Sequence, residues 1–312
     1  MPRVLALFSG GLDGALAIEV LRRAAVDPGA LVIVPVWVRV PCGIREARVN
    51  AAARGLDQPV ITLATPNTYD ELLLAAPRTG QGGAPPCRDC RVMMFRAARR
   101  YLEEIAADFV ISGEVLGQDI RIQRRRDLDM IAIGSGLDDR LLRPLSARRL
   151  SPTRAERDGI IDRQRLLDLQ GTGRRAQLAL AAEWGIDTGA FSRGACALAE
   201  ATLAGHVQRL QTSRLPVTPA TIAALRLGRV SWLDDTTVIV VSRRAEEADG
   251  LRQFVARREL TDCLLLELAH LAGPTALLLG AIDDRAISAA QQLVLERIDE
   301  PASSSVQWLT HR

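Results

Sequence analysis

From residue 3 to about 190, short apolar runs alternate with stretches of helical periodicity. Four runs have the length and composition of buried strands: Val4–Phe8, Ala30–Val40, Pro59–Leu63 and Phe109–Ile111. The helical stretches cover Asp13–Ala25, residues of about 44–55, a segment beginning near Thr68, and Arg88–Ala107. Nearly continuous apolar strands separated by helices are typical of a parallel sheet with both faces covered. The pattern predicts an α/β fold with a Rossmann-like parallel sheet, whose ligands bind at the carboxyl ends of the strands.

The pattern changes after Thr212–Pro219, a stretch with two prolines and several hydroxyl residues that suits a linker. Beyond it, two short strands around Asp234-Asp235 have the pattern of a hairpin. A helix over about 245–258, apolar runs at Cys263–Leu266 and Ala276–Leu279, and a helix over about 283–297 complete a smaller α+β unit. We expect a first domain over residues 1–200, a linker over 201–222, a second domain over 223–300 and a loose tail over 301–312.

The composition is that of an ordinary globular protein, with 48% hydrophobic and 25% charged residues. No apolar run approaches the roughly 20 residues that span a bilayer, and the start lacks a signal-peptide pattern, so we expect a cytoplasmic protein without a membrane partner. The net charge of +3 permits a nucleic-acid partner without requiring one. All 40 basic residues are arginine, which excludes a Schiff-base lysine, a lysine general base and the lysine of a Walker A loop.

The segment Phe8–Ala17 has the pattern of a phosphate-binding turn between a strand and a helix. Gly10 and Gly11 let the backbone approach an anion, and the free amides at the start of the helix point at it. Ser9 can add a hydroxyl donor. Asp13 alone would repel phosphate, so we expect it to hold a Mg²⁺ ion that bridges phosphate oxygens. The alternative is a tight turn in which Asp13 caps the helix.

Five cysteines, in a chain without an export signal, favour metal or redox chemistry over a disulfide framework. Cys87 and Cys90 lie three positions apart at a predicted helix start, where the helix N-terminus lowers the pKa of a thiol. Cys196 lies in a Gly/Ala-rich turn. Three thiolates could hold a [4Fe–4S] cluster with one iron open, or carry out persulfide and disulfide chemistry without metal. Cys42 is expected near the same edge of the sheet, and Cys263 in the core.

These segments resemble the PP-loop ATP pyrophosphatase superfamily, whose phosphate loop reads Ser-Gly-Gly-x-Asp-Ser. Over residues 1–200 the resemblance is to the tRNA-thiouridine synthases of that superfamily, the 2- and 4-thiouridylases. The segments that carry it are Ser9–Gly14, Pro86–Phe95, Ile111–Gln118, Leu142–Ala147 and Gly194–Cys196. The resemblance implies that a uridine carbonyl oxygen is adenylated by ATP with release of pyrophosphate. Sulfur from a cysteine persulfide, or from the open iron of a cluster, then displaces AMP.

The resemblance also implies roles for particular residues. It assigns ATP binding to Ser9, Gly10, Gly11, Leu12, Asp13 and Gly14, with Ser112 and Gly113 beside the nucleotide. It assigns sulfur handling, or ligation of a cluster, to Cys87, Cys90 and Cys196. Gly14 stands where the superfamily has its second serine, so one hydroxyl donor to pyrophosphate is missing and weaker ATP use is expected. An ordinary strand-to-helix turn is the alternative for the segment at Ser112.

The C-terminal unit resembles the RNA-binding domain of NFACT proteins, through Trp232–Arg243, Glu246-Glu247 and Ala272–Leu279. Arginines of both units could contact the phosphates of a tRNA. They are Arg121, Arg124–Arg126, Arg148-Arg149, Arg174-Arg175, Arg226, Arg229, Arg243 and Arg244. A solvated surface is the alternative for each of them.

The leading hypothesis is ATP-dependent thiolation of a tRNA uridine, with Mg–ATP, the cysteines and an external sulfur donor. Two alternatives stay open. One is a PP-loop enzyme that transfers sulfur or nitrogen to a small molecule, and the other is an RNA-binding protein with a degenerate ATP site. The sequence does not indicate which uridine is modified, whether sulfur attaches at C2 or C4, which donor supplies it, or the oligomeric state.

Overall fold

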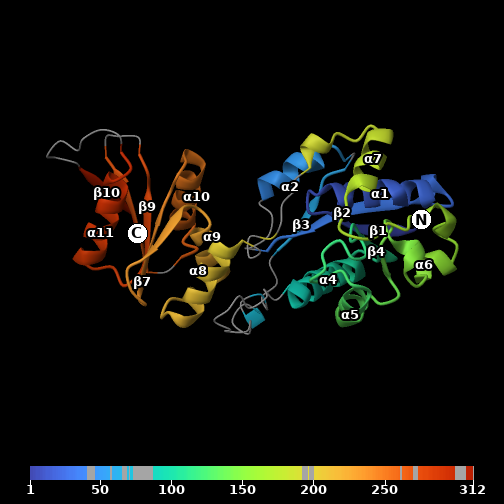
Figure 1. Cartoon of the computed structure of the whole chain (residues 1–312), viewed down its shortest axis with the longest axis horizontal. Coiled ribbons are helices and arrows are strands. Elements are labelled where there is room, and N and C mark those ends of the chain that lie inside the picture. The colour runs from blue at the N-terminus through green and yellow to red at the C-terminus, as the bar shows by residue number, and fades with distance from the viewer. Residues whose placement is uncertain are drawn as a thin grey trace. The chain divides into compact units, whose positions relative to one another are not determined.

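The computed structural model describes residues 1–40, 46–56, 58–64, 69, 71–72, 87–191, 196, 200–260, 262–269, 273–298 and 307–311. The chain divides into two compact units (Figure 1). The first comprises Met1–Leu72 and Ala84–Cys196, and the second is made largely of Ala197–Arg312.

The first unit is built on a five-stranded sheet with the order β3-β2-β1-β4-β5, in which every pairing is parallel. Its strands are β1 (Arg3–Leu7), β2 (Val32–Val38), β3 (Ile61–Leu63), β4 (Phe109–Ser112) and β5 (Leu141–Leu142). The central strands β1 and β4 are apolar and mostly buried, as a strand between two layers of helices must be. The predicted α/β fold with a Rossmann-like parallel sheet is confirmed.

Helices cover both faces of this sheet (Figure 1). α1 (Leu12–Ala24), α2 (Glu46–Ala53) and α7 (Arg175–Glu183) pack in one apolar core, and α4 (Cys87–Glu104) and α5 (Arg125–Ser135) pack in the other. α5 ends at Gly136, whose φ of +70° forms a left-handed C-cap. The short helices are η1 (Pro28–Ala30), η2 (Ala147–Arg149), α6 (Arg154–Arg157), η3 (Arg163–Arg165) and η4 (Thr188–Ala190).

The strand order reverses between β1 and β4. From β1 the chain adds β2 and β3 on one side, then returns to add β4 and β5 on the other. Leu7 pairs with Ser112, so β1 and β4 end side by side. Open α/β sheets bind their ligands at such a switch point, outside the carboxyl ends of the strands. The loops that follow β1 and β4 are therefore the place to look for a site.

The second unit is a five-stranded antiparallel sheet with the order β10-β8-β9-β7-β6. Its strands are β6 (Arg229–Trp232), β7 (Thr237–Val241), β8 (Cys263–Leu268), β9 (Ala276–Gly280) and β10 (Trp308–His311). Its helices are α8 (Ala201–Thr212), α9 (Pro219–Leu225), α10 (Ala245–Ala256) and α11 (Asp284–Leu295). α11 packs on one face of the sheet through Ala286, Ala290 and Val294. This is the smaller α+β unit that the sequence predicts.

Two expectations about this half of the chain differ from the structure. The expected linker over residues 201–222 contains α8 and most of α9. The tail is not loose throughout, because Trp308–His311 forms β10 and pairs antiparallel with β8. This strand brings Trp308 against the core that α11 covers, which gives an apolar reason for its docking. The helix expected near Thr68 falls mostly outside the described residues.

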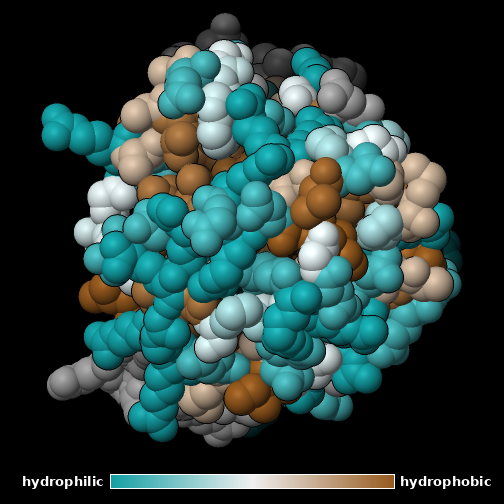
Figure 2. Space-filling model, turned by 90° about the vertical axis from the view of Figure 1, so that its right-hand side faces the viewer, coloured by the Kyte–Doolittle hydropathy of each residue, from teal (hydrophilic) through white to brown (hydrophobic). Residues whose placement is uncertain are grey.

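The surface of the first unit carries single apolar side chains between polar ones. Figure 2 shows brown apolar patches separated by teal hydrophilic surface on the side that it views. The large exposed apolar residues that the structure describes in this unit are Met1, Val26, Ile120, Met130, Ile133 and Leu178. Scattered residues of this kind are normal on a folded protein. Within the described part of the chain, no helix combines the length and apolarity that a membrane crossing needs.

Candidate active site

The turn between β1 and α1 brings the start of a helix to the switch point. Gly10 has φ +76°, a conformation that residues with a side chain rarely adopt. The N-cap of α1 is Gly11, and no side chain caps this end of the helix. Because the first N–H groups of a helix have no partner within it, this end of α1 suits an anion. The alternative in which Asp13 caps the helix is wrong, since Asp13 lies in the first turn, beyond the N-cap.

Gly113 brings the loop after β4 against this turn. A β-carbon built on Gly113 would lie 2.5 Å from the carbonyl carbon of Asp13 and 2.5 Å from the nitrogen of Gly14. Backbone atoms cannot be approached so closely, so only glycine fits. The neighbouring Ser112 is buried, and its hydroxyl donates to Glu114 Oε2 at 3.2 Å. The role of Ser112 and Gly113 beside a nucleotide stays a prediction, but Gly113 sets the distance between the two loops.

Gly14 packs closely on the ring of Phe8. A β-carbon at this position would lie 3.2 Å from Phe8 Cδ2 and 3.7 Å from the carbonyl oxygen of Leu7. Phe8 is only 1% exposed, so the ring has little room to move. The glycine that replaces the second serine of the PP-loop pattern therefore has a packing reason in this chain.

The carboxylate of Asp13 is held by two side chains from later in the sequence. Gln118 Nε2 donates to Asp13 Oδ2 at 2.7 Å, and a terminal nitrogen of Arg174 lies 3.4 Å from Asp13 Oδ1. Gln177 Nε2 in turn donates to Gln118 Oε1 at 2.8 Å. Gln177 is 1% exposed, so this network is anchored in the interior at the start of α7. It connects the loop after β1, the loop after β4 and α7.

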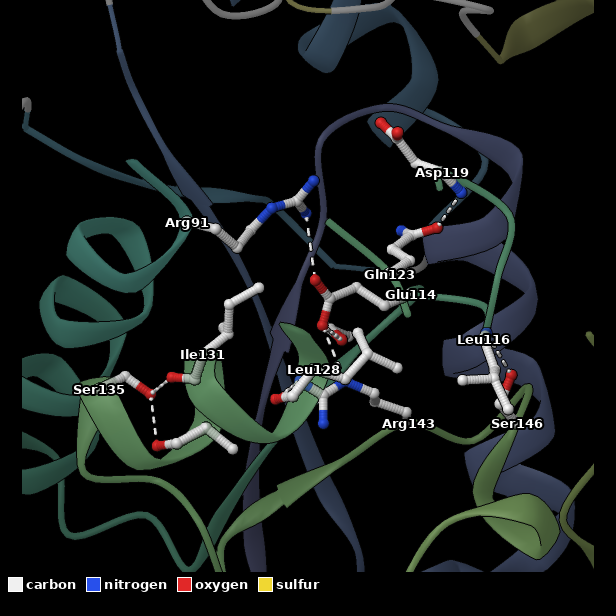
Figure 3. Close-up of polar contacts among 12 residues, drawn as sticks. Arg91, Glu114, Leu116, Asp119, Gln123, Leu128, Ile131, Ser135, Arg143 and Ser146 are labelled. Carbon is white, nitrogen blue, oxygen red and sulfur yellow. Dashed lines mark hydrogen bonds and ion pairs between the residues drawn. The ribbon is translucent and has the colours of Figure 1, made fainter. Parts of the chain in front are cut away.

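The loop after β4 carries a buried carboxylate, that of Glu114, which lies between Arg91 and Arg143 (Figure 3). Glu114 is 2% exposed; Arg143 Nε donates to its Oε2 at 2.8 Å, and a terminal nitrogen of Arg91 lies 3.6 Å from its Oε1. Burial alone would raise the pKa of Glu114, but the charges of Arg143 and Arg91 lower it below its usual value. Arg91 follows Cys90 on α4. The ion pair between Arg91 and Glu114 therefore connects this loop to the helix that carries Cys87 and Cys90.

Cys87 and Cys196 interact electrostatically. Cys87 begins α4 and is half-buried. Burial raises the pKa of its thiol, Arg121 opposes that shift, and Cys196 and Asp119 add to it. The expectation that the helix N-terminus lowers the pKa of Cys87 is wrong, because burial outweighs the nearby positive charges. Arg121 is itself fixed by Asp119, to which its Nε donates at 2.9 Å.

The described residues do not bring three ligands together as a metal centre. No three His, Cys, Asp or Glu side chains among them form a group that could hold a metal ion. Cys90 is half-buried one helical turn after Cys87, and Cys42 falls outside the described residues. The three thiols as placed therefore do not form a cluster site. Ligation of a cluster by Cys87, Cys90 and Cys196 stays a prediction.

Several residues expected elsewhere lie differently in the structure. Cys263, predicted in the core, is half-buried on β8. Arg148 and Arg149 both pair with Asp168, and Arg243 donates to the buried Glu247. By contrast, the side chains of Arg124 and Arg126 are exposed and form no hydrogen bond or ion pair among the residues that the structure describes. These two keep their charge available for a polyanion.

The sequence missed the residues that gather around Asp13. We expected Arg174 on the tRNA-binding surface, yet its guanidinium lies on the Asp13 carboxylate. Gln118 ends the segment Ile111–Gln118 that carries the resemblance, which was a usable signal. Gln177 gave none, because a glutamine in the middle of a helix has no distinctive pattern.

Comparison with known proteins adds two distant likenesses. No protein-family model and no curated protein matches the chain. One similar solved structure is the U34-tRNA thiolase NcsA from Methanococcus maripaludis with its [4Fe-4S] cluster, at 15% identity and a TM-score of 0.37, covering 66% of this chain and 64% of that one. Another is a predicted subunit of a tRNA methyltransferase from Methanocaldococcus jannaschii, at 13% identity and a TM-score of 0.30, covering 59% and 76%. At these values neither likeness supports an assignment of function. Any such assignment must rest on the residues of the candidate site.

Proposed function

We propose that this protein is an ATP-dependent tRNA sulfurtransferase that thiolates a uridine. The observation that supports it most is the continuity between the phosphate-binding turn and the thiols. Gln118 donates to Asp13, and its neighbour Asp119 holds Arg121 and acts electrostatically on Cys87. A turn that suits pyrophosphate, connected through two adjacent residues to a pair of thiols, supports a reaction that activates an oxygen with ATP and replaces it with sulfur.

In the first step, a uridine carbonyl oxygen attacks the α-phosphate of ATP. The new bond joins that oxygen to phosphorus, the bond to the β-phosphate breaks, and pyrophosphate leaves. The uncapped N-terminus of α1 would hold phosphate oxygens with its free amides. Asp13 has the oxygen ligands that suit Mg²⁺, which would neutralise phosphate charge while keeping several waters. Gln118 orients the Asp13 carboxylate for this purpose.

In the second step, sulfur replaces the activated oxygen. The outer sulfur of a persulfide on one cysteine bonds to the uridine carbon, and AMP leaves with the former carbonyl oxygen. A second thiol then attacks the inner sulfur, and the bond between the inner and outer sulfurs breaks and releases the thiolated uridine. The two cysteines are left as a disulfide, which an external thiol reduces. Cys87 and Cys196 are the two thiols that we assign to these roles, because Cys196 acts electrostatically on Cys87 and adds to the rise in its pKa. Because the thiols as placed do not form a cluster site, no step passes through iron.

Incubation with ATP, bulk tRNA and a persulfide donor, followed by nucleoside analysis, tests the proposal. A thiolated uridine that forms only with ATP, together with AMP and pyrophosphate, is the expected result. Absence of any thiolated base with an adequate donor would refute it. Metal analysis of protein purified without oxygen tests the separate prediction of a cluster, since bound iron that is lost in Cys87→Ala would make that cysteine a ligand.

A further inference from the structure

Arg174 has a buried donor that nothing in the described structure uses. It precedes α7 as its N-cap, and its side chain is 35% exposed. Its Nε is nevertheless buried and forms no hydrogen bond with any described residue. Leaving a buried N–H of a charged group without an acceptor is unfavourable, so such an atom calls for an explanation.

The position of Arg174 is fixed by hydrogen bonds at the start of α7. The beginning of α7 is fixed by Gln177, which is buried and donates to Gln118, and Gln118 donates to Asp13. These bonds hold the residue before α7 beside the turn that follows β1. One terminal nitrogen of Arg174 lies 3.4 Å from Asp13 Oδ1, while the adjacent Nε has no hydrogen-bond partner among the described residues.

The other arginines of the site are engaged with carboxylates. Arg121 donates to Asp119 through two nitrogens, at 2.9 and 2.8 Å. Arg143 donates to Glu114, and Arg91 lies 3.6 Å from the same carboxylate. Since the chain contains no lysine and only three histidines, arginine is the main source of side-chain cations that could bind phosphate. Among these side chains, only Arg174 combines contact with the phosphate-binding turn and an unused donor.

We propose that Arg174 is a phosphate-binding residue of the nucleotide site and contacts the pyrophosphate portion of ATP. The inference rests on the proposed function in that ATP binds the turn at Gly10–Asp13. A guanidinium offers its donors in a planar fork, so Nε and a terminal nitrogen can bind two oxygens of one phosphate or bridge two phosphates. Its charge also offsets the repulsion between Asp13 and the phosphates.

Binding isotherms for ATP, inorganic pyrophosphate and AMP test this assignment without measuring catalysis. The variants are Arg174→Ala and Arg174→Lys, with Arg175→Ala as the matched control, because Arg175 is adjacent, equally charged and exposed. Arg174→Ala is expected to weaken ATP and pyrophosphate by about tenfold to a hundredfold, the usual effect of losing a charged hydrogen bond. AMP affinity should change little. The affinity of Arg174→Lys for ATP and pyrophosphate should lie between those of Arg174→Ala and the parent protein. Arg175→Ala should bind ATP like the parent.

The outcomes distinguish this inference from the proposed function. If the parent protein binds neither ATP nor pyrophosphate, the proposed function fails and takes this inference with it. If the parent binds both and Arg174→Ala binds them equally well, the role of Arg174 is overturned while the proposed function stands. An equal loss for AMP, ATP and pyrophosphate would show collapse of the site and would also overturn a contact specific to pyrophosphate.

Discussion

The backbone of Asp13 lies directly against Gly113, at the point where the loops after β1 and β4 meet. A β-carbon on Gly113 would lie 2.6 Å from the carbonyl oxygen of Asp13. The two residues are distant in the sequence, yet the register of Leu7 with Ser112 brings their strands to the same edge. The turn between β1 and α1 is therefore supported from behind by backbone, and the position of one loop depends on the other.

Replacing Gly113 with alanine is expected to destabilise the first unit and weaken ATP binding. The new methyl group meets backbone atoms that cannot rotate away, so a loss of about 1–3 kcal/mol in the free energy of unfolding is expected. Denaturant unfolding and ATP titration measure the two effects. The matched control is Gly205→Ala on α8, where no atom lies within 4 Å of the added carbon. A Gly113→Ala variant as stable as the parent, with unchanged ATP affinity, would contradict this role.

Glu114→Gln is expected to cost about 3–5 kcal/mol of unfolding free energy, the usual penalty for removing one partner of a buried ion pair. Arg143, only 5% exposed, would keep its charge without the carboxylate that neutralises it. Urea unfolding at neutral pH measures the loss. Glu103→Gln serves as the control, because Glu103 is 51% exposed and pairs with the exposed Arg99. That pair should contribute at most about 1 kcal/mol.

Stability should also fall in acid because of Glu114. Despite the opposing effect of burial, Arg143 and Arg91 hold the pKa of Glu114 below its ordinary value. The unfolded chain therefore binds this proton at a higher pH than the folded chain does. The stabilisation is complete above the ordinary glutamate pKa of about 4.3 and is lost as pH falls through the lower, folded-state pKa. Glu114→Gln should show a shallower loss of stability over this acid range, and an unchanged slope would contradict the assignment.

The parts of the site that the sequence predicts are those encoded by neighbouring residues. An apolar strand followed by Gly10 and Gly11 specifies the turn into α1 locally, and spaced cysteines at a predicted helix start make Cys87 a candidate. The contact of Arg174 with Asp13 joins residues 161 positions apart and depends on the packing of α7, which has no local signature. The raised pKa of Cys87 likewise depends on burial by distant chain segments. Neighbouring residues therefore predict the helices, strands and turns. The polar contacts around Asp13 depend on tertiary packing and cannot be predicted in this way.

Cys196→Ala is expected to reduce formation of thiolated uridine by at least about a hundredfold, as removal of a covalent catalyst does. ATP affinity should remain, because the turn proposed to bind the phosphates does not include this residue. Nucleoside analysis gives the first quantity and ATP titration the second. Cys263→Ala is the control, since Cys263 is a half-buried thiol on β8 of the other unit. Equal thiolation by Cys196→Ala and the parent would remove Cys196 from the reaction.

Gly280→Ala is expected to unfold the second unit selectively. Gly280 has φ +98°, and a β-carbon there would collide with the carbonyl oxygen of Thr236 and with Leu215. Gly171→Ala separates strain from collision, because Gly171 has φ +86° but nothing within 4 Å of the added carbon. Strain alone should cost about 1–2 kcal/mol, and the collision should add to it. Unfolding monitored by hydrogen exchange should show lost protection in β7 and β9 while β1 and β4 stay protected. Equal destabilisation by the two variants would mean that the Thr236 carbonyl moves aside and that Gly280 is retained for its backbone conformation alone.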